Sequence, residues 1–375
     1  MRVEEIPPVR LGEIGEGPLT PAPGPAGKRL LRRLRGIGLE LIGFAAVTIL
    51  FPLLFVVALV VDLYLRVTRG KPMVGIRLLP FMWWFLLTEL GALTALAVIW
   101  LRAGGPFGKG SISRRRGVYW LRPRWARSHL GAFKLLFGMR IEIDGLDVAL
   151  PGPVLVMIRH ASIVDNLLPD TTLALRAGYG LRFVVKRELQ VLPAIDIGGR
   201  WIPTNFLNRA DAEIDQMVQL AHDLGSGEAV VIFPEGTRAT AKKIARAKEI
   251  VRERQPDVSP LAETMVNLLP PRLGGPLALL REAPDADVVF FAHAGFDGYE
   301  YISDIWAGGL VGATVRIKLW RVPASEVPTD GGDRALTEWL YEHWQQVDRW
   351  VGEQREQLGH VAGAAKATPR VGSPS

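Results

Sequence analysis

The sequence predicts an α/β protein whose central, mostly parallel or mixed sheet is flanked by helices and preceded by a hydrophobic two-helix membrane hairpin. Two long apolar stretches dominate the first hundred or so residues. From about residue 140, short apolar runs alternate with helical patterns, which is typical of an α/β domain. Hydrophobic residues make up 49% of the chain, which is high for a soluble protein rich in Gly and Pro.

These patterns divide the chain into four expected parts. Residues 1–27 are rich in Pro and Gly without periodicity and are expected to form a disordered lead-in. Residues 28–102 form the membrane hairpin, residues 103–360 the α/β domain, and residues 361–375 a disordered tail. The domain holds six predicted strands: "MRIEIDGL", "PVLVMI", "RFVVK", "EAVVIF", "ADVVFFAHAGF" and "ATVRIKLWRV". An amphipathic helix ending at Gly225 and a helix over residues 333–358 complete it.

Both apolar segments of the hairpin, at 36–65 and about 78–101, reach the roughly 20 residues needed to cross a bilayer. The first is too long for a signal peptide, and no small-residue cleavage site follows it. Lys and Arg on the two outer flanks outweigh those in the connecting "RVTRGKPMVGIR", which places the flanks and the α/β domain on the cytoplasmic face. The basic connection leaves a one-leaflet, re-entrant arrangement open, and a hairpin buried in a soluble core is the third alternative.

Composition excludes several kinds of chemistry. The chain has no cysteine, so disulfides, thiolate catalysis and Cys-based zinc sites are excluded. The net charge of +7 fits nucleic acid or anionic lipid equally well until the charges are located. The basic runs flank the apolar segments, and no basic motif interleaved with aromatic residues is present, so we expect no nucleic-acid partner.

The segment "MIRHASIVDNLLPD" carries the first candidate chemistry. His160 follows an apolar strand, and Asp165 comes five residues later. The two side chains can meet only across a non-helical turn, because five positions along an α-helix leave them on different faces. A carboxylate that fixes one imidazole nitrogen leaves the other basic, which suits the abstraction of a proton from a hydroxyl. Alone, the pair fits a structural hydrogen bond equally well.

The segment "VVIFPEGTR", residues 230–238, carries the second. It places Glu235, Gly236, Thr237 and Arg238 in one tight turn after a strand. Gly236 lets the backbone approach a ligand, and the planar guanidinium of Arg238 suits phosphate. Glu235 is an acceptor for ligand hydroxyls or an anchor for arginines. Taken alone, the turn could also be a strand-to-loop turn with a surface ion pair.

Together these residues resemble the glycerolipid acyltransferase family, specifically the 1-acylglycerol-3-phosphate acyltransferases. The family's first motif is met by His160 and Asp165, and its Phe-Pro-Glu-Gly-Thr-Arg motif by residues 233–238. Arg209 in "NFLNRAD" corresponds to the arginine of the second motif, and Lys186 opens a stretch like the family's Lys-x-Glu-Leu. The fourth motif is matched only loosely by "DVVFFAHAGF".

Two further details qualify the resemblance. The pair Pro271 and Arg272, together with the late Pro-flanked loop and Trp-Leu helix, is similar to the branch best known from eukaryotic endomembranes. The residue before the catalytic histidine is usually Asn in the family, whereas this chain has Arg159. The resemblance covers about residues 36–350.

The resemblance implies a membrane-bound enzyme that moves a fatty acyl group from acyl-CoA or acyl-carrier protein to a lysophospholipid, giving phosphatidic acid when the acceptor is 1-acylglycerol-3-phosphate. His160 and Asp165 would be catalytic, and no cofactor or metal would be needed. The expected substrate-binding residues are Lys186, Arg209, Glu235, Gly236, Thr237, Arg238 and Arg272. The basic stretches at 109–127 and 242–254 would hold anionic lipid or the phosphates of CoA, although the second could equally be a solvated helix face.

Two alternatives stay open at this point. Another lysophospholipid could be the acceptor without any change in the chemistry. A membrane-bound, metal-dependent hydrolase could use His160, but the remaining histidines show no metal-ligand spacing with it.

Overall fold

The computed structural model describes residues 14–15, 19, 25–107, 111–207, 214–297, 302–306 and 308–367. Its strands are β1 (Arg140–Asp144), β2 (Val154–Ile158), β3 (Gly180–Lys186), β4 (Thr204–Leu207), β5 (Glu228–Ile232), β6 (Asp287–Ala294) and β7 (Thr314–Val322). They form one seven-stranded sheet in the order β1-β7-β6-β2-β5-β3-β4. Only the β6–β7 pair is antiparallel, so the predicted mixed, mostly parallel sheet is confirmed.

The central strand β2 shows why an apolar run forms the middle of this sheet. Val154, Val156 and Ile158 belong to the core on one face, whereas Leu155 and Met157 belong to the core on the other. A strand buried on both faces needs apolar residues at every position rather than at alternate ones. β2 therefore lies between two layers of helices.

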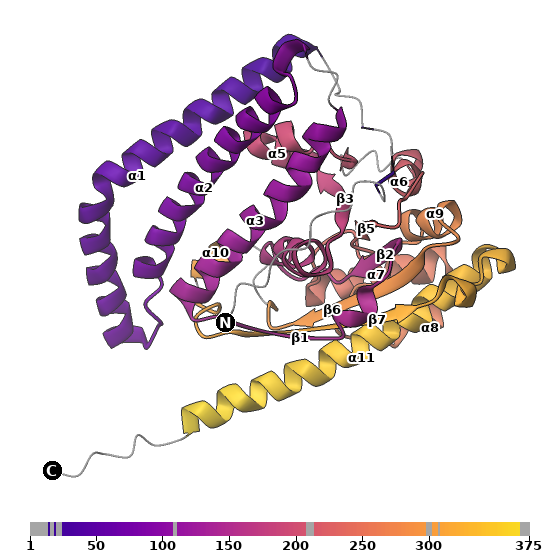
Figure 1. Ribbon diagram of the computed structural model, residues 1–375. Helices are drawn as coiled ribbons and strands as arrows, with labels where there is room; N and C mark the ends of the chain where they lie inside the picture. The colour runs from indigo at the N-terminus through magenta and orange to yellow at the C-terminus, as the bar shows by residue number, and fades with distance from the viewer. Residues whose placement is uncertain are drawn as a thin grey trace.

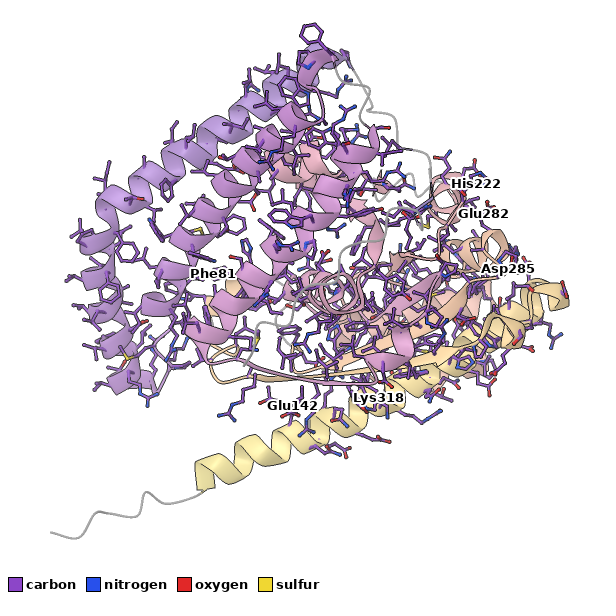
Figure 2. All side chains as sticks on the ribbon, viewed as in Figure 1. Phe81, Glu142, His222, Glu282, Asp285 and Lys318 are labelled. Atoms are coloured by element: carbon purple, nitrogen blue, oxygen red, sulfur yellow. The ribbon has the colours of Figure 1, made fainter. Side chains whose placement is uncertain are left out.

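Helices cover each face of the sheet (Figure 1). The first core contains residues of α3 (Ser111–Phe137) and of the short helical turn η4 (Val164–Leu167). The second contains residues of α6 (Ile214–Ala221), α9 (Gly274–Glu282) and α11 (Gly332–Ala367). At the surface, His222 Nδ1 lies 2.9 Å from Glu282 Oε1 and links the ends of α6 and α9 (Figure 2). The remaining helices are α4 (Leu175–Ala177), α5 (Pro193–Gly198), α7 (Ala241–Arg254), α8 (Ser259–Glu263) and α10 (Ile302–Trp306).

The register of the parallel strands brings several strand ends to one edge of the sheet. Met157 of β2 lies opposite both Ile232 of β5 and Phe290 of β6. The segments that follow these three strands therefore emerge together at the carboxyl edge. In open α/β sheets, ligands bind at this edge.

The N-terminal hairpin is formed by α1 (Ala26–Arg69) and α2 (Gly75–Arg102), with α3 beside α2 (Figure 1). Both hairpin helices are long and apolar enough to cross a membrane by length and composition. The most apolar stretch of α1 has none of its residues buried, so protein does not cover it. α1 bends partway along its length, and Pro52 lies inside it, where the proline removes a helical hydrogen bond.

The beginning of α1 is fixed to the α/β domain by an ion-pair cluster. Arg32 Nη2 and Arg33 Nε lie 2.9 and 2.7 Å from the two carboxylate oxygens of Asp196 in α5. The Asp196 side chain is fully buried, and Arg200 also contacts it at 3.2 Å. One end of the hairpin is thereby attached beside the edge where β3 ends.

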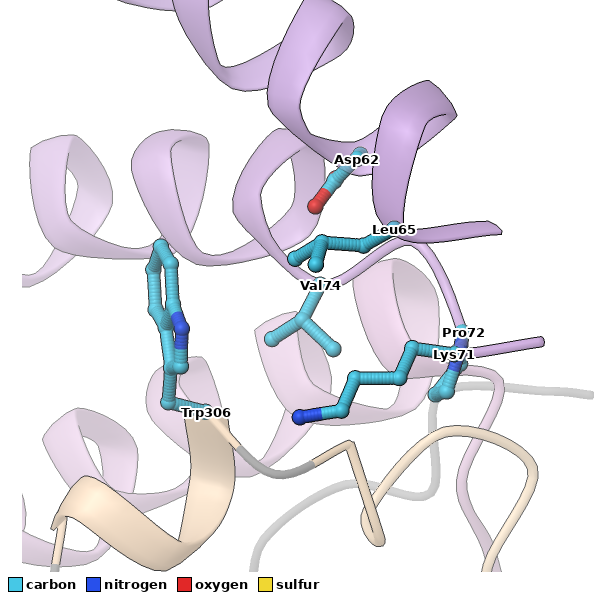
Figure 3. Close-up of a pocket in the computed structure, with 6 residues that line it drawn as sticks. All are labelled: Asp62, Leu65, Lys71, Pro72, Val74 and Trp306. Atoms are coloured by element: carbon cyan, nitrogen blue, oxygen red, sulfur yellow. The ribbon is translucent and has the colours of Figure 1, made fainter. Parts of the chain in front are cut away.

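The hairpin turn touches the α/β domain at a second place. Lys71 and Pro72 of the turn line a small pocket with Trp306 of α10 (Figure 3). Pro72 also packs so closely on Gly308 that a side chain there would overlap its ring. Near the end of α1, Asp62 accepts hydrogen bonds from the first two backbone N–H groups of α2, at 3.0 and 2.9 Å. Both ends of the hairpin therefore contact the domain.

Three features of the structure differ from the sequence-based expectation. The basic stretch predicted at 109–127 belongs, from residue 111 on, to the long helix α3, which continues to residue 137. The short strand β4 at the edge of the sheet was not predicted. The last helix continues to Ala367, into the range where a disordered tail was expected, and residues 368–375 lie outside the described residues.

Candidate active site

His160 stands two residues beyond the end of β2, at the carboxyl edge of the sheet. A non-helical turn separates it from Asp165, which lies in η4. His160 Nδ1 is 3.1 Å from Asp165 Oδ1 and 3.3 Å from Asp165 Oδ2. The structure thus brings together the two side chains whose meeting required such a turn.

Asp165 holds the turn as well as the imidazole. Its Oδ2 accepts hydrogen bonds from the backbone N–H groups of Ala161 and Ser162, at 2.7 and 2.8 Å. Burial opposes ionisation of this fully buried carboxyl, but His160, His293 and the Ser162 N–H together hold the pKa of Asp165 below its usual range. Asp165 is therefore a carboxylate under the conditions in which the protein works.

The ion-pairing geometry defines which nitrogen of His160 can act as a base. An ionised Asp165 requires the Nδ1 atom to carry the proton, which leaves Nε2 with its lone pair. The His160 side chain is 18% exposed while that of Asp165 is 0% exposed, so a ligand can reach the imidazole and not the carboxylate. The Phe233 ring, 4.4 Å away between centroids, packs on the imidazole and restricts its rotation.

Glu235 fixes the backbone of the histidine from the neighbouring strand. Its Oε1 accepts the His160 N–H at 2.7 Å, and its Oε2 accepts the Leu269 N–H at 3.2 Å. The side chain is buried, and burial raises the pKa of Glu235 to about 7, although Arg159 and the two N–H donors lower it. This carboxyl joins the turns after β2 and β5 and the loop at residue 269.

The turn after β5 needs a glycine. Gly236 has a φ of 64°, in the left-handed region, and its N–H donates to Phe233 O at 2.9 Å. The Arg272 side chain lies over it, since a Cβ built on Gly236 would stand 2.7 Å from Arg272 Cδ. Arg272 is exposed, and its backbone N–H donates to Pro234 O at 2.8 Å. Gly236 and Arg272, both predicted site residues, are therefore in contact.

The rest of this turn runs past His160. The Ala239 N–H donates to His160 O at 3.1 Å, and Lys243 Nζ donates to Arg238 O at 2.9 Å. Thr237 and Arg238 are both half-buried. The segment that carries the predicted anion-binding guanidinium is thus attached to the backbone of the histidine.

The side chains of two predicted site residues lie outside what the structure describes. Lys186 ends β3, with its Cα opposite Leu207 of β4, but its side chain lies outside what the structure describes. Arg209 lies in residues 208–213, outside the described residues. Their roles remain predictions.

The structure adds a buried polar network that sequence reasoning missed. The Arg159 guanidinium is ion-paired with Asp297, and its Nη1 donates to His293 O at 2.5 Å. His293 Nε2 lies 3.0 Å from Arg159 O and 3.6 Å from Asp165 Oδ2. Burial lowers the pKa of His293 to about 4, so this imidazole is neutral near pH 7. In the sequence, the only indication of this network was Arg159, which stands at a position where the family usually has Asn.

The acidic and histidine side chains of the site bear on whether a metal ion could bind here. Among the residues that the structure describes, no group of three or more His, Asp or Glu side chains is arranged to hold a metal ion. The proton chemistry available here is that of His160 and Asp165.

Comparison with known proteins agrees with this arrangement. Residues 140–258 match the family model described as Acyltransferase, and this range contains His160, Asp165 and the turn at 230–238. Lysophosphatidylinositol acyltransferase 10 of Caenorhabditis elegans is 22% identical over 249 residues, which cover 63% of this chain and 59% of that protein. This chain therefore spans less than two thirds of that relative's length.

The solved structure of the 1-acyl-sn-glycerophosphate acyltransferase PlsC from Thermotoga maritima is also similar to this chain. It superposes with a TM-score of 0.47 at 16% sequence identity, covering 74% of this chain and 98% of the other.

The turn after β5 generates a stability prediction. Gly236→Ala should lower the free energy of unfolding by about 1–2 kcal/mol, because an L-residue is strained at this φ and its Cβ would displace Arg272. Gly131→Ala, in the exposed interior of α3 where no other group approaches the added Cβ, is the control and should stabilise by about 0.5–1 kcal/mol. Denaturant unfolding in detergent measures both, and equal effects of the two substitutions would contradict the interpretation.

Proposed function

We propose that this chain, which belongs to the glycerolipid acyltransferase family, moves a fatty acyl group from acyl-CoA or acyl-carrier protein to the sn-2 hydroxyl of 1-acylglycerol-3-phosphate. The product would be phosphatidic acid. The observation that carries the proposal is the partly exposed His160 imidazole, held at 3.1 Å by the buried Asp165 carboxylate at the carboxyl edge of the sheet. A ligand-accessible base with an oriented tautomer is the equipment needed to activate a hydroxyl.

In this mechanism, His160 Nε2 takes the proton from the acceptor hydroxyl as its oxygen attacks the thioester carbonyl carbon. Asp165 stabilises the imidazolium that forms. The tetrahedral intermediate then breaks its C–S bond, and the imidazolium returns the proton to the departing thiolate. The acyl group moves directly between the two substrates, so the protein needs no nucleophile of its own, in keeping with a chain without cysteine.

The anionic head of the acceptor needs cationic partners. Arg238 and Arg272 lie on the segments around Gly236, next to His160, and are the described side chains best placed for a phosphate. We assign Lys186 and Arg209 to the same task from their motifs. Glu235 acts by holding the catalytic backbone, because both of its oxygens already accept backbone N–H groups.

A second acceptor class has a specific observation in its favour. The C. elegans relative is named a lysophosphatidylinositol acyltransferase. The proton-transfer chemistry at His160 is unchanged for such an acceptor. An acceptor with a larger head group on its phosphate is therefore the alternative.

We also propose that the hairpin lies within one leaflet instead of crossing the bilayer. Its beginning is attached to α5 through Asp196, and its turn contacts α10 at Trp306. A spanning hairpin would carry its turn to the far side of the membrane, away from the domain. The exposed apolar surface of α1 would then be covered by lipid acyl chains, and the site would stand at the bilayer surface.

Removal of the base tests the reaction. His160→Ala should reduce acyl transfer to below a few per cent of the wild-type rate, because no other group replaces the imidazole. The assay uses purified protein, labelled acyl-CoA or acyl-carrier protein, and a panel of lysolipids that includes lysophosphatidate and lysophosphatidylinositol, with products resolved by mass. His222→Ala, a surface histidine, is the control. Retention of more than a few per cent of turnover in His160→Ala would refute the general-base role.

The pKa of Glu235 predicts a pH dependence. Below about pH 7 this carboxyl gains a proton and can no longer accept both N–H groups, so the His160 backbone loosens. Because the base must also be unprotonated, log(kcat/KM) should fall on the acid side with a limiting slope of about two. Glu235→Gln should reduce that slope to about one and lower the rate at pH 8 by at least about 10-fold.

The control for this pH profile is Glu282→Gln at the surface, which should behave like the wild type. A Glu235→Gln variant that keeps the wild-type slope would show that another group titrates.

The cysteine-free chain permits a direct test of the hairpin. Single cysteines replacing the exposed Lys71, in the hairpin turn, and the exposed Lys242, in α7 of the catalytic domain, should react with a membrane-impermeant maleimide from the same side of sealed vesicles. Reaction from opposite sides would mean that the hairpin spans the bilayer. Detergent-opened vesicles supply the reference for full labelling.

A further inference from the structure

A charged chain of side chains connects helix α11 to the residue before the catalytic histidine. Asp297, just after β6, accepts a hydrogen bond from Arg355 Nη2 of α11 at 2.5 Å and is ion-paired with Arg159 on its other side. Arg159 is 0% exposed and Asp297 25% exposed. The interaction joins segments 138 and 58 residues apart in the sequence, so it fixes the tertiary structure at the site.

Arg159 is a full positive charge buried against the site's carboxylates. The groups that face it are Asp297 from the segment after β6, Glu235 from the turn after β5, Asp165 from η4, and His293 from β6. Ion pairing with Asp297 outweighs the effect of burial and keeps the pKa of Arg159 above its usual value, so the charge is permanent. Arg159 cannot touch a substrate, because its side chain is fully covered.

α11 also holds the opposite side of the site. The buried Asp348 carboxylate accepts the backbone N–H groups of Val266, Asn267 and Leu268, at 3.1, 2.7 and 2.7 Å. The next N–H, of Leu269, donates to Glu235. Arg355 reaches this loop too, since its Nη1 donates to Asn267 Oδ1 at 2.9 Å. One helix therefore positions both the loop that holds Glu235 and the group that holds Arg159.

We infer that Arg159 is a positioning residue for the acyl transfer, held by Asp297 and, through Asp297, by Arg355 of α11, and that its buried charge favours the carboxylate form of Glu235, which holds the His160 backbone. This inference rests on the proposed function of the site. It assigns a role in that reaction to a residue that differs from the family's usual Asn and to an arginine on the last helix.

The first experiment separates the charge of Arg159 from its structural role. In the pair variant Arg159→Gln/Asp297→Asn, both charges of the ion pair are removed together, so neither partner is left buried without the other and the protein is expected to fold. The pair variant should lose about 10- to 100-fold in kcat at pH 8, and the acid limb of its kcat/KM profile should move up by about one pH unit. Arg159→Lys should keep the wild-type acid limb, because the positive charge stays.

A pair variant with the acid limb at the wild-type pH would overturn the electrostatic role, whatever its rate.

The second experiment tests the connection to α11. Arg355→Met should lower kcat about 3- to 10-fold with KM for both substrates unchanged, and should have a clearly smaller effect in the pair variant, where the charged partner Asp297 is gone and only the contact with Asn267 remains. Arg349→Met, on the exposed face of the same helix, is the matched control and should have no effect in either background.

An equal loss from Arg355→Met in both backgrounds would overturn the connection. Failure of the proposed function is recognised separately, since the wild-type protein would then transfer no acyl group to any acceptor in the panel. In that case the unfolding midpoints of the same variants, which need no substrate, still report whether Arg355 and the Arg159–Asp297 pair are coupled. Additive effects on the midpoint would refute the coupling.

Discussion

The site depends on a hydrogen bond between the turns that follow two neighbouring parallel strands, β2 and β5: the His160 N–H donates to the buried carboxyl of Glu235. This bond fixes the position of the histidine backbone, and the two N–H bonds to Asp165 fix the turn that follows. The imidazole is in turn oriented by the Asp165 carboxylate and the Phe233 ring. A buried carboxyl is costly unless its oxygens are satisfied; backbone N–H groups satisfy both oxygens of Glu235, and backbone N–H groups and the His160 imidazole satisfy those of Asp165.

The surrounding architecture makes this bond possible. β2 is apolar on both faces and lies between two helical layers, so its end is held in a dry environment where a hydrogen bond is stronger than in water. The parallel register aligns β2 with β5 and β6, and the segment after each strand supplies a different part: His160, the carboxyl of Glu235 that holds its backbone, and Asp297. The same environment requires a compensating positive charge, and Arg159 supplies it.

Local patterns in the sequence predicted six of the seven strands, the hairpin and the His160–Asp165 turn, because apolar periodicity and short-range motif spacing determine them. The long helix α3 was not predicted because its many arginines and Pro123 interrupt the apolar periodicity of its sequence. The face that it buries packs against α2, and this contact is evident only in the three-dimensional structure. The roles of Asp297 and Arg355 arise from contacts between distant segments, which no local pattern reveals. Glu235 was predicted as a ligand acceptor or an arginine anchor, but only the three-dimensional structure shows which N–H groups occupy its oxygens.

In the proposed one-leaflet arrangement, attachment of the hairpin at both ends would set the depth of the site relative to the lipid head groups. The two attachments are at α5 and α10, which follow β3 and β6 along the chain. A domain attached at one point could tilt against the bilayer, whereas a domain attached at two points would keep a bound acceptor hydroxyl at a constant height. Additional carbons on either acyl chain would then extend into the membrane, so the lipid phase would accommodate differences in chain length.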